Sequence, residues 1–341
     1  MLHIRTDGNA QIGTGHVMRC IEIAKAYEEN IGPVQFLVAD TESKNFIESK
    51  GFSCYVLDSK WDDLDSECHK LAKCKEECNV KCLLIDSYFI TKDYVKVWKE
   101  LGVKVAYLDD FCNESYAFDA LFNGALWATE EGYDRFYGKT ETKLYLGCEY
   151  ISLRKEFATV PKKETKEKAD NVLVLSGGTD PYHFLLRFLE NLPKDMEKEC
   201  QYYLVCGIFN GDYAKINEMC RGRENIHILQ NVSDLYEYMC KADVAVSAGG
   251  MTLYELCACG TPCIMYLLAD NQKGNLEGFT KAGLFESIGD IREKIDFELL
   301  FEKIRKLMQS YDMRSKKGME LQKLVDGKGA YRIAGELGKL S

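Results

Sequence analysis

The sequence predicts an α/β protein of two domains, each a doubly wound parallel sheet of the Rossmann type with helices on both faces. Its 341 residues exceed what one hydrophobic core usually organises, so two cores are the default. Near-continuous apolar runs alternate with helix-like stretches up to residue 110 and again from residue 171, which is typical of buried parallel strands. Between these alternations, residues 160–168 are charged and almost without apolar side chains, as expected of a solvated linker.

The first domain is expected over residues 1–158. Strands are predicted where apolar residues run together, and helices where they recur at helical spacing, as Val17, Ile21 and Ala24 do. The expected strands are 2–7, 34–39, 54–57, 82–86 and 104–110, with helices at 17–27, 62–78 and 91–101 and a closing segment at 144–154.

The second domain is expected over residues 169–311, and residues 312–341 are expected to form C-terminal helices that pack back on the first domain. The strands of this second domain are predicted to begin near residues 171, 202, 226, 242 and 262. Two such domains joined by one linker predict that they face each other across a cleft, which is the usual place for a small-molecule site.

Composition excludes several classes of partner. The formal net charge is −10, which argues against binding to nucleic acid or to an acidic membrane surface, because either would require a basic face. No apolar run approaches the length of a membrane span, and the chain begins in a predicted strand without the apolar core of a secretory signal. We therefore expect a cytoplasmic protein with neither nucleic acid nor membrane as partner.

The fifteen cysteines include no C-x-x-C pair. In a long chain of this kind they are best interpreted as small buried hydrophobes that stay reduced. No metal and no other cofactor is expected.

A glycine-rich turn near the N-terminus carries the first candidate for chemistry. Gly13 and Gly15 lie between a predicted strand and a helix, and His16 follows them, so an imidazole stands where backbone N–H groups can meet an anion. The dinucleotide fingerprint G-x-G-x-x-G fails, because Met18 occupies the third glycine position. The alternative is that the glycines only form a tight turn and that His16 is an ordinary residue of the first helical turn.

Polar residues at strand ends are further candidates, because ligands of open parallel sheets bind beyond the carboxyl ends of the strands. Taken singly, most such aspartates are helix caps or turn formers. Asp86-Ser87-Tyr88 stands out, because a tyrosine there can direct its hydroxyl into the cleft. The strand-end aspartates are Asp7, Asp40, Asp58, Asp86, Asp109 and Asp110.

A second glycine-rich turn follows the strand predicted from residue 242. Gly249 and Gly250 let a backbone approach a diphosphate, and Thr252 offers a hydroxyl. Glu255 lies about one turn further on the same face, where its carboxylate could accept both hydroxyls of a ribose. A capping box of Thr252 with Glu255 fits the spacing equally well.

These residues resemble known families. Gly-Gly-x-Thr-x-x-Glu-Leu followed by Ala-x-Gly-x-Pro resembles the nucleotide-binding half of two-domain GT-B glycosyltransferases of the MurG type, which implies a GT-B-like fold with UDP on the second domain. A longer set of motifs is similar to the PseG hydrolases, which release UDP from UDP-2,4-diacetamido-2,4,6-trideoxy-β-L-altropyranose in pseudaminic acid biosynthesis. These motifs are Asp7, Gln11-Ile12-Gly13-x-Gly15-His16-x-Met18-Arg19, Leu108-Asp109-Asp110, Gly147 to Tyr150, Leu153-Arg154-x-Glu156-Phe157, Ser176-Gly177-Gly178-x-Asp180-Pro181 and Ala269-Asp270-Asn271-Gln272.

The resemblance implies that His16 is the general base that activates water to attack the anomeric carbon with inversion. The chain departs from the family in reading Asp-Ser-Tyr and Arg-Thr-Asp where Asp-His-Tyr and Arg-Ala-Asp are more usual, which leaves the identity of the amino sugar open. The substrate-binding residues that it implies are Asp7, Gly13, Gly15, Arg19, Tyr88, Asn271 and Gln272. The UDP-binding residues that it implies are Ser176, Gly177, Gly178, Gly249, Gly250, Thr252 and Glu255.

The chemistry of such a hydrolysis suits one histidine. A UDP phosphate oxygen leaves as a weak base, so the reaction needs a base for water more than an acid for the leaving group, and imidazole can accept that proton near neutral pH. Three alternatives remain open. A glycosyltransferase would need an acceptor platform, often an apolar or basic face of the first domain, which the sequence does not reveal. A hydrolysing UDP-sugar 2-epimerase would also release UDP but would differ in product stereochemistry. A UDP-sugar-binding protein would lack catalysis.

Overall fold

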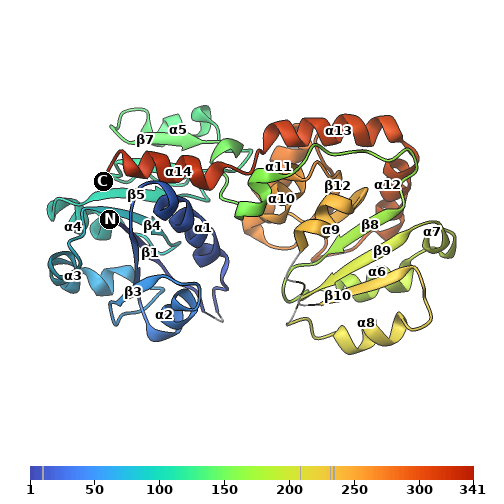
Figure 1. Cartoon of the computed structure of the whole chain (residues 1–341), viewed down its shortest axis with the longest axis horizontal. Helices are drawn as coiled ribbons and strands as arrows, with labels where there is room; N and C mark the ends of the chain where they lie inside the picture. Colours follow the sequence, from blue (N-terminus) through green and yellow to red (C-terminus); the bar gives the residue numbers. More distant parts are fainter. Residues whose placement is uncertain (10, 208, 231, 233–234) are drawn as a thin grey trace. The chain divides into compact units, whose positions relative to one another are not determined.

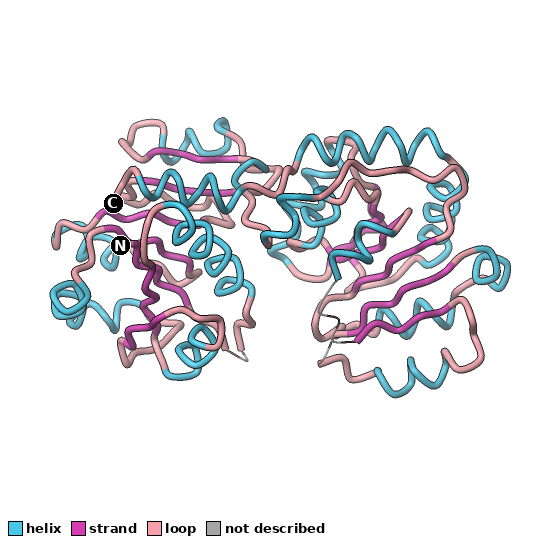
Figure 2. The backbone as a smooth tube through the Cα atoms, in the orientation of Figure 1, coloured by secondary structure: helices cyan, strands magenta, loops and turns pink. Residues whose placement is uncertain are grey.

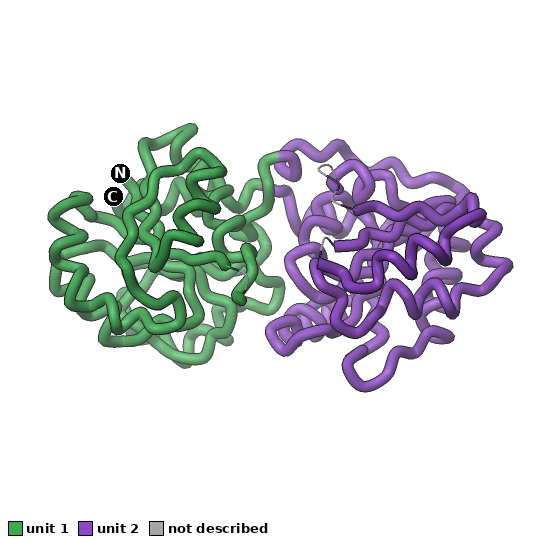
Figure 3. The backbone as a smooth tube through the Cα atoms, turned by 90° about the horizontal axis from the view of Figure 1, so that it is seen from below, with its two compact units in different colours: residues 1–155, 328–341 green, residues 156–327 purple. Residues whose placement is uncertain are grey.

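The computed structural model describes the chain from Met1 to Ser341 except residues 10, 208, 231 and 233–234. It divides into two compact units, residues 1–155 with 328–341 and residues 156–327 (Figure 3). Each unit is one sheet with helices on both faces (Figures 1 and 2), and every strand pairing is parallel. The prediction of two doubly wound Rossmann-like domains is confirmed.

The first sheet has the strand order β3-β2-β1-β4-β5-β6-β7. The order reverses between β1 and β4, and this switch point is where open α/β sheets bind ligands, beyond the carboxyl ends of the strands. The strands are β1 Leu2–Thr6, β2 Val34–Val38, β3 Ser53–Val56, β4 Cys82–Asp86, β5 Lys104–Leu108, β6 Ala120–Asn123 and β7 Lys143–Leu146. The helices are α1 Gly15–Asn30, α2 Thr41–Glu48, α3 Leu71–Cys78, α4 Lys92–Glu100, α5 Glu130–Tyr137 and α14 Gly329–Gly338.

The second sheet has the strand order β10-β9-β8-β11-β12-β13, with its switch point between β8 and β11. The strands are β8 Asn171–Leu175, β9 Gln201–Cys206, β10 Ile226–Gln230, β11 Val244–Ala248, β12 Cys263–Leu267 and β13 Glu286–Asp290. The helices are α6 Phe184–Asn191, α7 Lys194–Glu199, α8 Tyr213–Met219, α9 Leu235–Lys241, α10 Thr252–Ala258, α11 Lys273–Lys281, α12 Phe297–Gln309 and α13 Tyr311–Leu324.

Local sequence explains where several helices begin. The Asp40 carboxylate accepts from the backbone N–H of Ser43 at 2.8 Å and caps α2, and the Thr91 hydroxyl caps α4 in the same way. In α1, the residues at helical spacing, among them Val17, Ile21 and Ala24, are fully buried. Asp40 is thus a helix cap, as expected of most strand-end aspartates.

The C-terminal helices differ from the expectation for residues 312–341. The buried guanidinium of Arg314, on α13, donates to the carbonyls of Leu307 and Lys166, which keeps α13 within the second unit. Only α14 packs with the first unit, where Ile333 and Leu337 share a core with α1. The chain therefore returns to the first unit at residue 328 rather than at 312.

Some short elements were not predicted. The polar helix expected near 62–78 is a 3-10 helix, Leu64–Lys70, followed by α3. The strands β6 and β13 and the helix α5 were missed because four- and five-residue strands and an eight-residue helix carry little periodicity. Among the described residues, no helix combines the length and apolarity that a membrane crossing requires.

Burial of His3 in β1 predicts a pH dependence of stability. The ring is fully buried, and burial lowers its pKa to about 4. Because the unfolded chain binds the proton more tightly, stability is fully present above pH 6.5 and falls as the pH drops towards 4, by up to about 3 kcal/mol. Urea unfolding at pH 7 and pH 4.5 should therefore show a larger loss for the wild type than for His3→Gln. Equal losses in both proteins would contradict a neutral buried imidazole.

Candidate active site

His16 and Asp86 meet at the switch point of the first sheet. His16 is the second residue of α1, which follows β1, and Asp86 is the last residue of β4. The Nδ1 of His16 lies 2.6 Å from Oδ1 of Asp86, and their side chains are 14% and 0% exposed. A carboxylate only accepts hydrogen bonds, so in the neutral imidazole the tautomer that fits this contact has its proton on Nδ1 and its lone pair on Nε2. His16 is thus an oriented imidazole, not merely a residue of a tight turn.

Arg19 fixes the carboxylate that holds His16. Its guanidinium donates to both oxygens of Asp86, at 2.6 and 2.5 Å, and to both oxygens of Asp110, at 2.8 and 2.9 Å. Arg19 also lies 3.2 Å from Nδ1 of His16, but the 2.6 Å contact with Asp86 is the shorter one and determines the tautomer. Because two carboxylates occupy its donors, Arg19 positions the site rather than offering a free cation to the substrate.

Electrostatics keep this network charged. Burial alone would raise the pKa of the Asp86 carboxyl, but the charge of Arg19 and the hydrogen bonds from Arg19 and His16 outweigh burial and hold that pKa well below its usual range. Burial would lower the pKa of Arg19, whereas Asp110 and Asp86 raise it well above its ordinary value. The carboxylate beside His16 therefore stays ionised and can stabilise an imidazolium formed during proton transfer.

Tyr88 completes the network and begins an aromatic surface. Its hydroxyl donates to Oδ2 of Asp110 at 3.0 Å, and its ring packs edge-on against His16 with centroids 4.4 Å apart. Burial, reinforced by Asp110, raises the pKa of Tyr88, so it remains a neutral donor. Phe111 packs against Tyr88 and Phe89 against Trp61. Tyr88, Phe89 and Phe111 are 41%, 40% and 42% exposed.

This aromatic surface corrects one expectation from the sequence. An apolar acceptor platform on the first domain was not recognised, yet the partly exposed rings of Tyr88, Phe89 and Phe111 form an apolar face beside His16. This surface is not evident from the sequence, because its aromatic residues belong to separate loops, after β3, β4 and β5, which meet only through the order of the strands in the sheet. We call Trp61, Tyr88, Phe89 and Phe111 the aromatic wall.

A cavity of about 190 Å³ opens beside His16 within the first unit. It is large enough for several water molecules or part of a sugar ring. Its mixed lining, with an imidazole, a carboxylate and apolar rings, suits a hydroxylated ligand that has apolar substituents. The lining residues are Asp7, Ile12, His16, Trp61, Asp86, Ser87, Tyr88 and Phe89.

The remaining predicted residues of the first unit support this cavity. Asp7 is buried; it pairs with Arg5, and its Oδ1 accepts from the backbone N–H of Ala39 at 2.7 Å, so its carboxylate is largely occupied by the protein. Gly13 has φ of +74°, a conformation that favours glycine, and its N–H bonds to the carbonyl of Asn9. Gly15 begins α1, and a side chain there would meet no atom within 4 Å.

In the second unit, both predicted glycine turns lie at the switch point of the sheet. Ser176, Gly177 and Gly178 follow β8, and Gly249 and Gly250 follow β11, which is the neighbour of β8. Gly177 has φ of +78°. The structure thus brings together two turns that are about 70 residues apart in the sequence, at the edge where an open α/β sheet binds its ligand.

The segment after β12 packs against the turn at Gly249 and Gly250 and hydrogen-bonds to it. Gln272 is half-buried, and a Cβ on Gly249 would lie 3.2 Å from its Cβ. The amide of Asn275 donates to the carbonyl of Gly249 at 2.9 Å and accepts from the hydroxyl of Tyr254 at 2.6 Å. Asn271 is exposed. Asn275, on α11, was not predicted, and its position three residues after Gln272 is the sequence signal that could have pointed to it.

The capping alternative for Thr252 is wrong. Helix α10 begins at Thr252, and Met251, in the N-cap position, has helical backbone angles and makes no capping hydrogen bond with its side chain. Thr252 is therefore the first helical residue and its hydroxyl does not act as the cap. Thr252 and Glu255 are half-buried and lie about one turn apart on the same helix.

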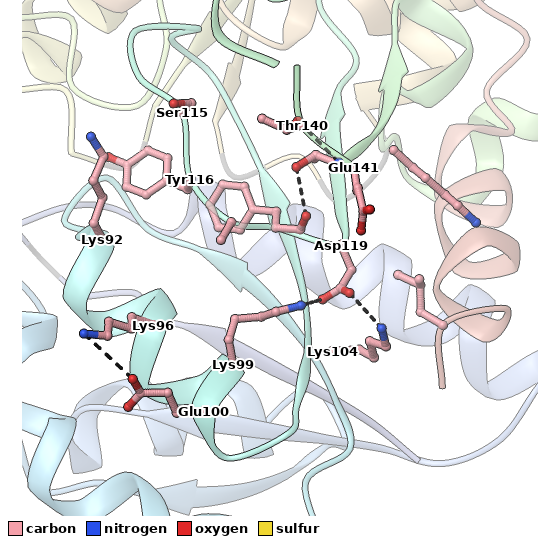
Figure 4. A pocket seen from close by; sticks show the side chains of 15 residues that line it. Lys92, Lys96, Lys99, Glu100, Lys104, Ser115, Tyr116, Asp119, Thr140 and Glu141 are labelled. Atoms are coloured by element: carbon pink, nitrogen blue, oxygen red, sulfur yellow. Dashed lines mark hydrogen bonds and ion pairs between the residues drawn. The ribbon is translucent and has the colours of Figure 1, made fainter. Parts of the chain in front are cut away.

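A wider groove on the first unit contains none of the predicted residues (Figure 4). It measures about 1020 Å³ and lies where β5, β6 and β7 begin, at the sheet edge opposite Asp86. Four of its lysines pair with carboxylates. Lys99 and Lys104 both bind Asp119, at 2.5 and 3.0 Å. Among the described residues, no group of three His, Cys, Asp or Glu side chains is placed to hold a metal ion.

Comparison with known proteins identifies the class to which this fold belongs. The crystal structure of Acinetobacter baumannii MurG matches it with a TM-score of 0.72 at 13% identity, covering 99% of this chain and 100% of that chain. Residues 171–330 match the model of the glycosyltransferase family 28 C-terminal domain. The chain therefore has a MurG-like GT-B fold, and almost all residues that match this domain model lie in its second unit.

Two sequence relatives define the similarity more closely. The spore coat polysaccharide biosynthesis protein SpsG of Bacillus subtilis is 24% identical over 336 residues, which is 97% of this chain and 95% of SpsG. The UDP-2,4-diacetamido-2,4,6-trideoxy-β-L-altropyranose hydrolase of Campylobacter jejuni is 29% identical over 191 residues, which is 56% of this chain and 65% of that hydrolase. The similarity to the hydrolase thus covers part of the chain.

Proposed function

We propose that this protein is an enzyme that acts on a UDP-sugar and hydrolyses it to UDP and the free sugar. The observation that carries the proposal is the hydrogen bond from Nδ1 of His16 to the ionised, Arg19-bound carboxylate of Asp86, beside a cavity. This arrangement supplies a base for water and a counter-charge for the imidazolium. The partial similarity to the Campylobacter jejuni hydrolase supports the same reaction.

The proposed reaction uses His16 in one step. Nε2 accepts a proton from water, the water oxygen bonds to the anomeric carbon from the face opposite UDP, and the bond from the anomeric carbon to the phosphate oxygen breaks. UDP leaves with the bonding electron pair, and the sugar is released with inverted configuration. The proposed substrate is UDP-2,4-diacetamido-2,4,6-trideoxy-β-L-altropyranose, whose deoxy and acetamido groups suit the aromatic wall. Asp7, Gly13, Gly15, Arg19, Tyr88, Asn271 and Gln272 are proposed to bind or shape the sugar site.

UDP is proposed to bind the second unit at its switch point. In the turn after β11 the N–H groups of Gly249 and Gly250 bond to the carbonyls of Tyr266 and Ala248. The diphosphate is therefore proposed to meet the backbone N–H groups of the turn after β8 and the hydroxyl of Thr252, and Glu255 is placed to accept the ribose hydroxyls. The match of residues 171–330 to a glycosyltransferase domain supports a nucleotide there. No metal or other cofactor is part of the proposal. The residues concerned are Ser176, Gly177, Gly178, Gly249, Gly250, Thr252 and Glu255.

Replacing Glu255 tests the nucleotide site. Loss of charge-assisted hydrogen bonds to a ribose costs about 1.5–3 kcal/mol, so Glu255→Ala should weaken UDP binding roughly 10- to 100-fold. Calorimetry with UDP measures this, and Glu302→Ala on the exposed surface of α12 is the matched control. Unchanged affinity in Glu255→Ala would place the ribose elsewhere.

Glycosyl transfer is the second candidate, because the aromatic wall is an apolar face of the kind that an acceptor would use. The deciding experiment incubates the protein with UDP-diacetamido-trideoxyhexoses and no acceptor, and follows UDP and the sugar anomer by NMR. Hydrolysis predicts stoichiometric UDP and free sugar, with the anomer inverted at early times. UDP release that requires an added acceptor alcohol would instead establish transfer.

A further inference from the structure

Two cysteines of the second unit form a thiol pair that the proposed reaction does not use. Cys240 lies in the last turn of α9, and Cys259 directly follows α10. Their sulfur atoms are 3.4 Å apart, although nineteen positions separate them in the sequence. A disulfide requires about 2.05 Å, so a shift of little more than 1 Å would bring the sulfurs to bonding distance.

A half-buried cation, Lys163, lies beside this pair. The ammonium group of Lys163 donates to the carbonyls of Cys240 and Ala242, both at 2.6 Å, and to the hydroxyl of Thr261 at 3.1 Å. Contact with Cys259 lowers the pKa of the Cys240 thiol, and the charge of Lys163 acts in the same direction while burial opposes both. The same contact raises the pKa of Cys259. Cys240 is therefore the thiol that ionises first.

The two sulfurs differ in access. Cys240 is half-buried and lines a cavity of about 480 Å³ together with Lys163, Tyr203 and Tyr238. Cys259 is 1% exposed. A reagent in the cavity would therefore reach Cys240 first, and Cys259 would stand behind it as the second thiol. This is the arrangement of an attacking and a resolving cysteine.

We propose that Cys240 and Cys259 are a thiol–disulfide exchange site for small dialkyl disulfides such as glutathione disulfide. The Cys240 thiolate attacks one sulfur of the small disulfide, forms a mixed disulfide and displaces one small thiolate. Cys259, after losing its proton to solvent, attacks the Cys240 sulfur and displaces the second small thiol. The protein loses two electrons and forms the Cys240–Cys259 disulfide, while the small disulfide gains them and becomes two thiols.

The chain contains a matched control pair. Cys74 and Cys78 lie one turn apart on α3, and their thiols are in hydrogen-bonding contact. Burial raises the pKa of both, and the neighbouring carboxylate of Glu77 raises it further. Proximity alone would make the two pairs equally reactive, whereas the environment around Lys163 favours Cys240 and Cys259.

The test treats the full chain with glutathione disulfide at pH 7.5, blocks remaining thiols with N-ethylmaleimide at timed intervals, and identifies cross-linked tryptic peptides by mass spectrometry. The Cys240–Cys259 link is expected to form at least tenfold faster than the Cys74–Cys78 link and to disappear with dithiothreitol. Cys259→Ser should accumulate glutathione on Cys240, and Cys240→Ser should leave Cys259 unmodified. Equal rates for the two pairs, or no Cys240–Cys259 link in the wild type, would overturn the proposal.

The cross-link would join α9 to α10, the helix that carries Thr252 and Glu255. If UDP binds at α10, as the proposed function has it, oxidation should weaken UDP binding several-fold. The reason is that the disulfide draws the C-terminal end of α10 towards α9. Calorimetry of the oxidised and re-reduced protein measures this, and equal affinities would overturn the regulatory role. A reduced protein that binds no UDP would count against the proposed function and leave the peptide result standing.

Discussion

His16→Ala is expected to lower the rate of UDP release by about 10²- to 10⁴-fold, the usual contribution of a general base. The reason is that the water then has no acceptor for its proton, since Asp86 is held by Arg19 and lies behind the imidazole. Affinity for UDP should stay within about twofold, because the proposed nucleotide site belongs to the other unit. Single-turnover kinetics and calorimetry measure the two quantities separately.

A second histidine variant shows whether the loss of rate is specific to His16 or follows from removing any histidine. His69 is exposed in the 3-10 helix before α3, and His69→Ala should retain the wild-type rate and UDP affinity. If His16→Ala lost UDP binding together with turnover, binding and chemistry would not be divided between the units as proposed. If it retained full turnover, His16 would not be the base.

Asp86→Asn is expected to lower kcat by about 10²- to 10⁴-fold and to leave KM and UDP affinity nearly unchanged. The amide occupies the same volume but carries no charge, so it neither stabilises the imidazolium nor fixes which nitrogen of His16 holds the proton. It also leaves Arg19 with Asp110 as its remaining carboxylate partner. Steady-state kinetics with the UDP-sugar give kcat and KM.

Stability must be measured in the same experiment, because Asp86 is fully buried in a charged network. Asp110→Asn is the informative companion: it disturbs the same arginine but does not touch His16, so it should cost much less in kcat than Asp86→Asn. A wild-type kcat in a folded Asp86→Asn protein would remove this carboxylate from the mechanism. Equal losses in both variants would mean that the network acts only through stability.

Topology was the best predicted property. Buried strands such as residues 82–86 and 171–175 read as apolar runs, so their alternation with helices predicted both sheets. The glycine turns at Gly13 and Gly249 were also visible, since positive φ and close backbone approach leave few other residue choices. Short elements such as β6 were not, because four residues between two loops carry no distinctive period.

The network around His16 depended on contacts that no local pattern encodes. The segment Asp86-Ser87-Tyr88 stood out for its tyrosine and not for Asp86 itself, and Asp110 looked like any other strand-end aspartate. Asp40 and Asp109 are indeed a helix cap and a turn former. What distinguishes Asp86 is that β4 lies next to β1 and that Arg19 lies one helical turn beyond His16. The first fact follows from strand order, which brings residues about 70 positions apart into contact. The second is a local helical spacing whose meaning depends on the first.

In the proposed reaction His16, oriented by Asp86, makes water the nucleophile at the anomeric carbon. Running the reaction in ¹⁸O-labelled water and locating the label by mass spectrometry and NMR tests this step. One ¹⁸O is expected on the anomeric carbon of the released sugar, in the inverted configuration, and none in UDP. Label in the β-phosphate of UDP, or an anomer of retained configuration at the earliest times, would contradict it.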